Sequence, residues 1–181
     1  MRDSREIAMP SLYRQIMGSD FESLAPELRT LHDQIGTRIF EGYCAIEPAQ
    51  SRIARYIAWV MRLPTHKSVG GFQFELQQQP GKEIWLRHFP DSHMCSHMHV
   101  QSGELIERFG VVKFRFGLSA HQHALTMTLI GISISGLSLP RPLLPKVWGR
   151  EHGADGKFYF DAGASWGKLG RLVAYSGWLK I

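Results

Sequence analysis

An arginine and a glutamate, Arg87 and Glu107, lie among large apolar residues in two segments that have the alternation of strands and are separated by one further predicted strand, 92–101. The segments are 82–89 (KEIWLRHF) and 104–109 (ELIERF). Side chains alternate across a strand, so residue parity places both charges on the same face as Trp85. Burying a single charge is costly, so the two must pair with each other or meet a ligand. The pattern predicts either a structural ion pair or the polar end of a ligand pocket.

In a pocket, the guanidinium of Arg87 is suited to orient a carboxylate, phosphate or enolate oxygen, because it is a planar fork of donors. Glu107 is the candidate acceptor or general base. These two are the candidate catalytic residues, and both are candidate ligand-binding residues. The same inner face supplies the apolar candidates for ligand binding, which are Trp85, Met98, Phe114 and Phe116.

Two further carboxylates lie in the last predicted hairpin, which turns at the loop 153–156. Pairing around this loop places Glu151 opposite Phe158, facing inward together with Phe160. Glu151 and Phe160 are therefore added to the ligand-binding candidates. Asp161 has the opposite parity, so we expect it to be solvated or paired with an arginine. Carboxylates that share acid and base roles need a common face, and these two are expected on different faces.

His93, Cys95, His97 and His99 share one face of a predicted strand, with His88 across the turn. Imidazole and thiolate groups bind Zn, Ni or Cu. However, neighbours on one side of a strand are about 6.6–7 Å apart, too far to share an ion on a straight strand. Parity also places this face outside the sheet. We therefore expect surface histidines and no metal site, and no other motif indicates a cofactor.

The N-terminal third of the chain predicts helices. Segments Ser11–Gly18 and Phe21–His32 have helical spacing and end signals, and Gly36–Glu47 has the pattern of a strand. A further helix is predicted over Pro48–Arg62, because proline suits a first helical turn. Its apolar face consists of Ile53, Tyr56, Ile57 and Val60.

From about residue 68 onward the chain predicts short strands joined by tight turns. If 110–111 is a two-residue turn, Phe114 lies opposite Glu107, and four consecutive strands agree on which side is inside. The isoleucines within 130–134 have the opposite parity, so either a bulge shifts the register or a helix covers the outer face. The predicted turns are Pro80-Gly81, Pro90-Asp91, Ser102-Gly103 and Gly110-Val111.

About ten antiparallel strands result, and meanders of this length tend to close and so remove their exposed edges. The predicted fold is mainly β: an up-and-down barrel-like sheet of lipocalin or fatty-acid-binding type, with N-terminal helices on its outer face or over one end. We expect a single domain over 1–181, with a helical segment at 1–35 and a barrel at 36–181 that contains an inserted helix at 48–62.

The segment Ser138–Pro145 (SLPRPLLP) predicts a crossing loop, because its three prolines remove backbone donors and fix φ. Arg141 lies in this loop, near the expected mouth of the barrel. It is a candidate ligand-binding residue that grips an anionic group. The alternative is that it caps nearby carbonyl groups.

Composition narrows the class of protein. The net charge is +5 and the pI is about 9.4, but the basic residues are scattered, which argues against nucleic acid as a partner. The uncharged run Ala124–Pro140 is short for a bilayer and alternates like a strand, so no membrane span is expected. Cys44 and Cys95 fit no disulfide framework, and the first residues contain no apolar signal region. A cytoplasmic protein is predicted.

Several short motifs follow one another along the chain: LYRQIMG, LRTLHD, WLRHF (Trp85–Phe89), LIERFG (Leu105–Gly110), SLPRPLLP, DGKFYFD (Asp155–Asp161) and YSGWL (Tyr175–Leu179). In this order they resemble a bacterial family known as domain of unknown function 4166. The resemblance covers nearly the whole chain and implies that the domain occurs alone or behind a dehydrogenase-like domain that binds a dinucleotide. It also implies recurrent polar positions at Arg87, Glu107, Arg108, Arg141, Glu151 and Asp161.

Three functions remain open at this point. The first is binding of a small hydrophobic or amphipathic molecule with a polar or anionic head in a barrel pocket. The second is an enzyme, free of cofactors, that isomerises or cyclises a biosynthetic intermediate by proton transfer at Glu107 and Arg87. The third is a non-catalytic partner domain of a dehydrogenase-like protein, suggested by the family's fused arrangements. The first two need a cavity, whereas the third tolerates a filled barrel.

Overall fold

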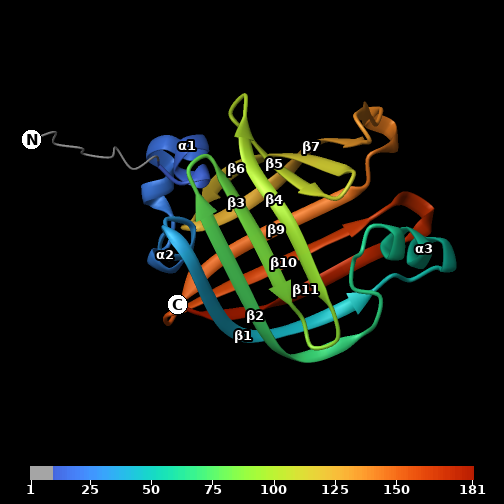
Figure 1. The fold of residues 1–181 in the computed structure, drawn as a ribbon, viewed down its shortest axis with the longest axis horizontal. Coiled ribbons are helices and arrows are strands. Elements are labelled where there is room, and N and C mark those ends of the chain that lie inside the picture. The colour runs from blue at the N-terminus through green and yellow to red at the C-terminus, as the bar shows by residue number, and fades with distance from the viewer. Residues whose placement is uncertain (1–9) are drawn as a thin grey trace, which may run out of the picture.

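The described part of the chain, residues 10–181 of a computed structural model, is built around one antiparallel sheet of eleven strands (Figure 1). Their order is β6-β5-β4-β3-β2-β1-β11-β10-β9-β7-β8, and a further pairing of β6 with β7 closes the ring. The strands are β1 (Gly36–Pro48), β2 (Ser68–Gln79), β3 (Lys82–His88), β4 (His93–Gln101), β5 (Glu104–Phe109), β6 (Val112–His121), β7 (Ala124–Ile134), β8 (Leu137–Ser138), β9 (Lys146–Ala154), β10 (Lys157–Ser165) and β11 (Arg171–Lys180).

Closure of this sheet makes a barrel of ten strands, because β8 only extends the end of β7 and stays outside the ring. Two pairings complete the ring: β1 with β11, and β6 with β7. Between β7 and β9 the ring is held by four residue pairs only. The predicted closed antiparallel barrel with N-terminal helices is therefore confirmed. Within residues 10–181 no helix combines the length and apolarity that crossing a bilayer requires.

The pairing register of β5 with β6 is set by the two-residue turn between them. The turn at 110–111 sets Glu107 opposite Phe114, as predicted. Between β6 and β7 the register shifts by one residue after Arg115, so that Ile130 has no partner and Ile132 turns into the core. A bulge of this kind inserts one residue and exchanges the faces beyond it. Of the two explanations for the parity of the isoleucines, the bulge is the correct one.

The β9–β10 hairpin corrects the predicted register. Its strands continue to Ala154 and Lys157, and Asp155 and Gly156 form a two-residue turn with φ of 52° and 71°. Positive φ at both central residues is typical of the tight turns that match strand twist. Glu151 therefore lies opposite Phe160 rather than opposite Phe158. The predicted inward direction of Glu151 holds, because it is buried.

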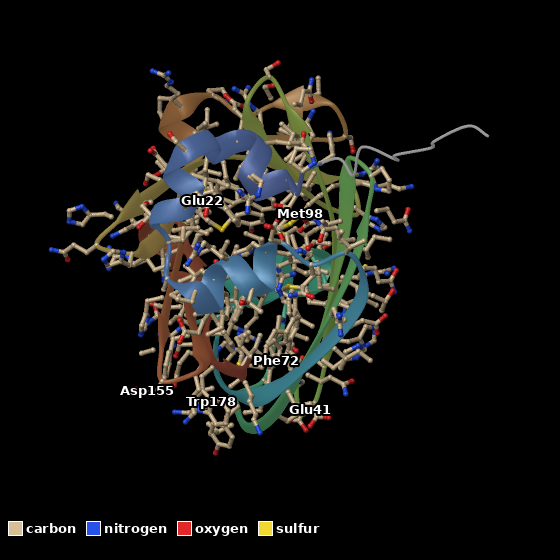
Figure 2. The ribbon with its side chains drawn as sticks, turned by 90° about the vertical axis from the view of Figure 1, so that its left-hand side faces the viewer. Glu22, Glu41, Phe72, Met98, Asp155 and Trp178 are labelled. Carbon is tan, nitrogen blue, oxygen red and sulfur yellow. The ribbon has the colours of Figure 1, made fainter. Side chains whose placement is uncertain are left out.

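The N-terminal helices α1 (Leu12–Met17) and α2 (Pro26–His32), with the 3₁₀ turn η1 (Gly18–Ser23) between them, close one end of the barrel. Figure 2 faces this end: the helices lie across it, and the labelled Phe72 and Met98 lie inside the ring of strands. The predicted helix over 21–32 is in fact broken at Leu24, because Pro26 occupies the first turn of a separate helix.

This helical plug is fixed by both apolar burial and hydrogen bonds. The backbone N–H of Ala25 donates to the carbonyl of His123 at 2.9 Å, and the N–H of Gly156 donates to a carboxylate oxygen of Glu27 at 3.1 Å. These bonds attach the plug to the β6–β7 and β9–β10 turns. Each large apolar side chain buried in such a contact contributes about 1.5–3 kcal/mol. The plug's buried apolar residues include Leu12, Tyr13, Phe21, Leu28 and Leu31.

Helix α3 (Arg52–Val60) lies between β1 and β2 in the sequence and at the other end of the barrel from α1 and α2 (Figure 1). It begins later than the predicted Pro48, because β1 continues through that residue and the Ser51 side chain caps the helix. It packs through Ala54 and Ala58, which are fully buried. Most of the predicted apolar face, Ile53, Tyr56 and Val60, is instead exposed.

Candidate functional site

The barrel encloses a cavity of about 1700 Å³ that extends to the α3 end. The turns between β3 and β4 and between β5 and β6 border it there, together with residues of α3 and of the turn that follows it. The plug closes the opposite end, with Leu31 of α2 bordering the cavity. Eight of the predicted ligand-binding residues line this cavity: Trp85, Arg87, Met98, Glu107, Phe114, Phe116, Glu151 and Phe160.

Arg87 and Glu107 form the predicted pair on the cavity wall. Nη2 of Arg87 donates to Oε1 of Glu107 at 3.1 Å, and Nη1 donates to Oγ of Ser96 at 3.0 Å. Both charged residues are only 6% exposed. Burial opposes the charge of Arg87, but nearby Tyr175 and Glu107 outweigh that effect and raise its pKa. The guanidinium of Arg87 remains charged, and its pair with Glu107 both links β3 to β5 and borders the cavity.

Aromatic rings hold the guanidinium of Arg87 in place. Its Cζ atom lies 4.9 Å from the ring centroid of Trp85 and 6.0 Å from that of Phe109. A cation within about 6 Å of an aromatic face is attracted by the ring quadrupole. The two hydrogen bonds of Arg87 to residues of the described chain use two of its five donors. Three N–H groups are therefore left to bind a group in the cavity.

A second polar contact joins the plug to the barrel wall. Nε2 of His32, at the end of α2, lies 2.7 Å from Oε2 of Glu151 on β9. The imidazole is completely buried and stacks on the ring of Tyr13 at a centroid distance of 3.7 Å. Glu151 borders the cavity, so this contact leads from the cavity into the plug.

Behind this contact lie three buried polar atoms that have no hydrogen-bond partner among residues 10–181: Nδ1 of His32, the hydroxyl of Tyr13 and Oε1 of Glu83. The other oxygen of Glu83 accepts from Nε1 of Trp85 at 3.0 Å. Burial raises the pKa of Glu83. Burial, followed by the charge of Glu151, raises the pKa of Tyr13 well above its usual value. Unpaired buried groups of this kind are uncommon in folded proteins.

Tyr175 adds a neutral phenol to the cavity wall. It lies on β11, and its ring centroid is 5.5 Å from that of Phe89 and 6.1 Å from that of Phe160. Burial raises its pKa to about 12. The hydroxyl is therefore protonated throughout the physiological pH range and is available both to donate and to accept a hydrogen bond.

Three predicted polar positions are exposed rather than buried, and two of them, Arg108 and Asp161, still border the cavity. Arg141 lies exposed on the 3₁₀ turn η2 (Arg141–Leu143) near the α3 end and does not line the cavity, so its role in gripping a ligand stays a prediction. Asp161 is exposed and accepts a hydrogen bond from Nε1 of Trp148 at 3.1 Å. Arg108 is exposed, and its Nε donates to the Gly110 carbonyl at 2.8 Å.

The histidine-rich strand faces outward as predicted. His93, Cys95, His97 and His99 alternate as exposed residues with the buried side chains of β4. Across the described residues 10–181, no three His, Cys, Asp or Glu side chains come together as ligands for a metal ion.

Sequence reasoning missed several polar residues of the interior. Glu83 has the parity of Trp85 and Arg87, and Ser96 has the parity of the inward-facing Met98, so strand alternation was a usable signal for both. Burial of His32 could not be anticipated, because its partner Glu151 lies far away in the sequence. Tyr175 stands within the YSGWL motif, but a motif does not say which of its residues face the cavity.

Seven chains of solved structures match. One is the crystal structure of Rv2717c from M. tuberculosis, with a TM-score of 0.47 and 10% sequence identity over 87% of this chain and 98% of that chain. No curated protein matches. A family model does: the one described as "Domain of unknown function (DUF4166)" matches residues 24–179, from the plug to the last strand. The chain therefore belongs to the DUF4166 family.

Proposed function

We propose that this protein binds a small, elongated, apolar molecule with a polar head inside the barrel. The observation that carries this proposal is the cavity of about 1700 Å³, whose walls are apolar apart from a few converging polar groups. Ligand pockets are commonly about 300–1000 Å³ with this composition, so the volume is ample for one small molecule. It supports the binding and enzymatic hypotheses, since both need a hollow barrel.

The polar groups favour a particular kind of head. Of the charged residues that border the cavity, the buried ones are one guanidinium, Arg87, and two carboxyl groups, Glu107 and Glu151. An anionic head would meet the guanidinium only beside two carboxyl groups. A neutral head that both accepts and donates, such as a hydroxyl or an enol, instead suits the free donors of Arg87, a free oxygen of Glu107 and the phenol of Tyr175. We therefore favour a neutral polar head over an anionic one.

Filling the cavity tests the proposal. Ala162 lies on the inner face of β10, opposite Tyr175, and borders the cavity. Ala162→Phe adds a ring where the ligand would lie. It is expected to weaken binding of the neutral fluorophore N-phenyl-1-naphthylamine by about tenfold or more, a loss of about 1.4 kcal/mol. Fluorescence titration measures this affinity.

The matched control is Ser176→Phe, which adds the same ring on the exposed face of the neighbouring strand β11. Its affinity for the fluorophore should equal that of the unaltered protein. If long-chain alcohols displace the fluorophore at lower concentration than the corresponding carboxylates, the neutral head is supported. Equal loss in both phenylalanine variants, or no binding to the unaltered protein, would contradict the proposal.

A second candidate function is proton-transfer catalysis on the bound molecule. It is favoured by the hydrogen bond between His32 and Glu151, because Glu151 borders the cavity with an imidazole as its partner. Glu107→Gln keeps the shape of the side chain but cannot accept a proton. An enzyme should then retain the molecule that co-purifies with it, identified by native mass spectrometry, and lose its conversion. If neither the unaltered protein nor the variant converts that molecule, binding alone remains.

A further inference from the structure

Helix α3 presents an apolar face to solvent. Ile53, Tyr56, Trp59 and Val60 are 61%, 66%, 67% and 56% exposed, although the helix is anchored by its two buried alanines. The rings of Tyr56 and Trp59 lie 6.0 Å apart and form one aromatic pair. Exposed apolar patches of this kind mark interaction sites rather than ordinary surface. Tyrosine and tryptophan are suited to a boundary between an apolar phase and water, because each combines an apolar ring with a polar atom.

The charged residues of α3 and of the turn that follows it have one sign. The sequence contains neither Asp nor Glu between Glu47 and Glu75, whereas Arg52, Arg55 and Arg62 lie in or directly after α3. All three arginines are exposed, and the salt bridges found in residues 10–181 involve none of them. Helices that lie in a membrane interface combine basic residues with an apolar face that carries aromatic side chains.

Further apolar side chains are exposed at the same end of the barrel. They lie on the β5–β6 turn, after β7 and on η2, and Val69 at the start of β2 is also exposed. Arg141 lies exposed among them. This end is also the one to which the cavity extends, and the cavity is bordered there by residues of α3 and its following turn. The exposed apolar residues, besides Val69, are Val111 of the turn, Leu137 of β8 and Leu143 of η2.

We propose that α3 docks the open end of the barrel on a lipid bilayer that contains anionic phospholipid. Tyr56 and Trp59 enter the interface between headgroups and acyl chains, and the arginines contact phosphate groups. The cavity then opens towards the membrane, and an apolar molecule passes between the two without crossing water. Docking stands on the α3 surface itself, whereas the exchange of a ligand rests on the function proposed above.

Vesicle sedimentation tests docking. The full-length protein is mixed with vesicles of pure phosphatidylcholine, or of phosphatidylcholine and phosphatidylglycerol in roughly a 3:1 ratio. Binding is expected on the anionic vesicles and should weaken as salt is added. The double variant Arg52→Gln/Arg55→Gln is expected to lose about fivefold in affinity per arginine, and Tyr56→Ser/Trp59→Ser should lose at least as much. Because these four side chains are exposed, thermal unfolding of both variants should match that of the unaltered protein.

The matched control carries the same kinds of change at a distant exposed site. Arg38 and Ile39 are neighbours on β1 and both are exposed, so Arg38→Gln/Ile39→Ser removes one charge and one apolar side chain away from α3. Its vesicle binding should be unchanged. Equal loss in this control, or equal binding to neutral and anionic vesicles, would overturn the proposal.

The measurements distinguish membrane docking from dimerisation through α3, and from a failure of the proposed ligand binding. If α3 instead pairs with a second copy, analytical ultracentrifugation will show a dimer that Tyr56→Ser/Trp59→Ser dissociates, with no vesicle binding, and membrane docking is then wrong. If the fluorophore enters the cavity but the protein ignores anionic vesicles, ligand binding stands and docking falls. If the protein docks but excludes the fluorophore, docking stands and the ligand-binding function falls.

Discussion

Replacing Glu107 with leucine is expected to destabilise the protein by about 3–5 kcal/mol, because it leaves the guanidinium of Arg87 buried without its partner. An arginine cannot release its proton inside a protein, so the stranded charge cannot be relieved. Urea unfolding followed by tryptophan fluorescence measures the loss.

Two control variants make this prediction specific. Glu104→Gln breaks the pair of Glu104 with Arg115, which also involves a glutamate of β5 but joins it to β6 on the outer face of the sheet. Exposed pairs contribute about 0–1 kcal/mol, so this variant should be nearly neutral. Arg87→Met strands Glu107 instead, which can take up a proton. Burial would raise its folded pKa above the unfolded value, so the stability of Arg87→Met should fall as the pH rises. Equal effects of Glu107→Leu and Glu104→Gln would show that the inner pair is not desolvated.

Gly42→Ala is expected to destabilise the protein by about 3 kcal/mol, because a methyl group on Gly42 would overlap the carbonyl oxygen of Trp178 on β11. The same methyl group would lie 2.8 Å from the Trp178 carbonyl carbon and 2.9 Å from Cα of Leu179. All of these are main-chain atoms of the strand that closes the ring against β1, so the clash cannot be relieved by a side-chain rotation. Chemical denaturation again measures the difference.

Gly71→Ala is the natural comparison for this variant. Gly71 pairs with Tyr43 on the other side of β1, and a methyl group there would meet no heavy atom within 4 Å. Its stability should stay within about 0.5 kcal/mol of the unaltered protein, as expected for a surface change. Equal losses in the two variants would mean that β1 and β2 both tolerate alanine poorly in place of glycine, and that close approach to β11 is not the cause.

Much of the inner face could be predicted from the sequence because tight turns fix the register. Once 110–111 is a two-residue turn, Glu107 must pair with Phe114. Strand alternation then assigns the inward-facing residues of the strands before and after this turn. The same logic located Trp85 and Arg87. It worked because period-two alternation is a local property and each turn contributes only a few residues.

The rest depends on packing between distant segments. The contact of His32 with Glu151 joins α2 to β9, and no local pattern announces it. Whether aromatic residues fill a barrel or line a cavity depends on its diameter, which is set by how many strands close the ring. The solvent exposure of Tyr56 follows from α3 packing through its alanines, whereas apolar spacing alone suggests a buried face.

The pairing of β1 with β11 also has a consequence for synthesis of the chain. These strands are far apart in the sequence, so the ring is completed only after β11 leaves the ribosome. Until then β1 is an open edge that carries the exposed side chains of Ile39 and Tyr43. Such edges pair readily with other chains, and topologies dominated by distant contacts fold slowly. We expect the nascent protein to be most prone to aggregation in the interval before β11 closes the barrel.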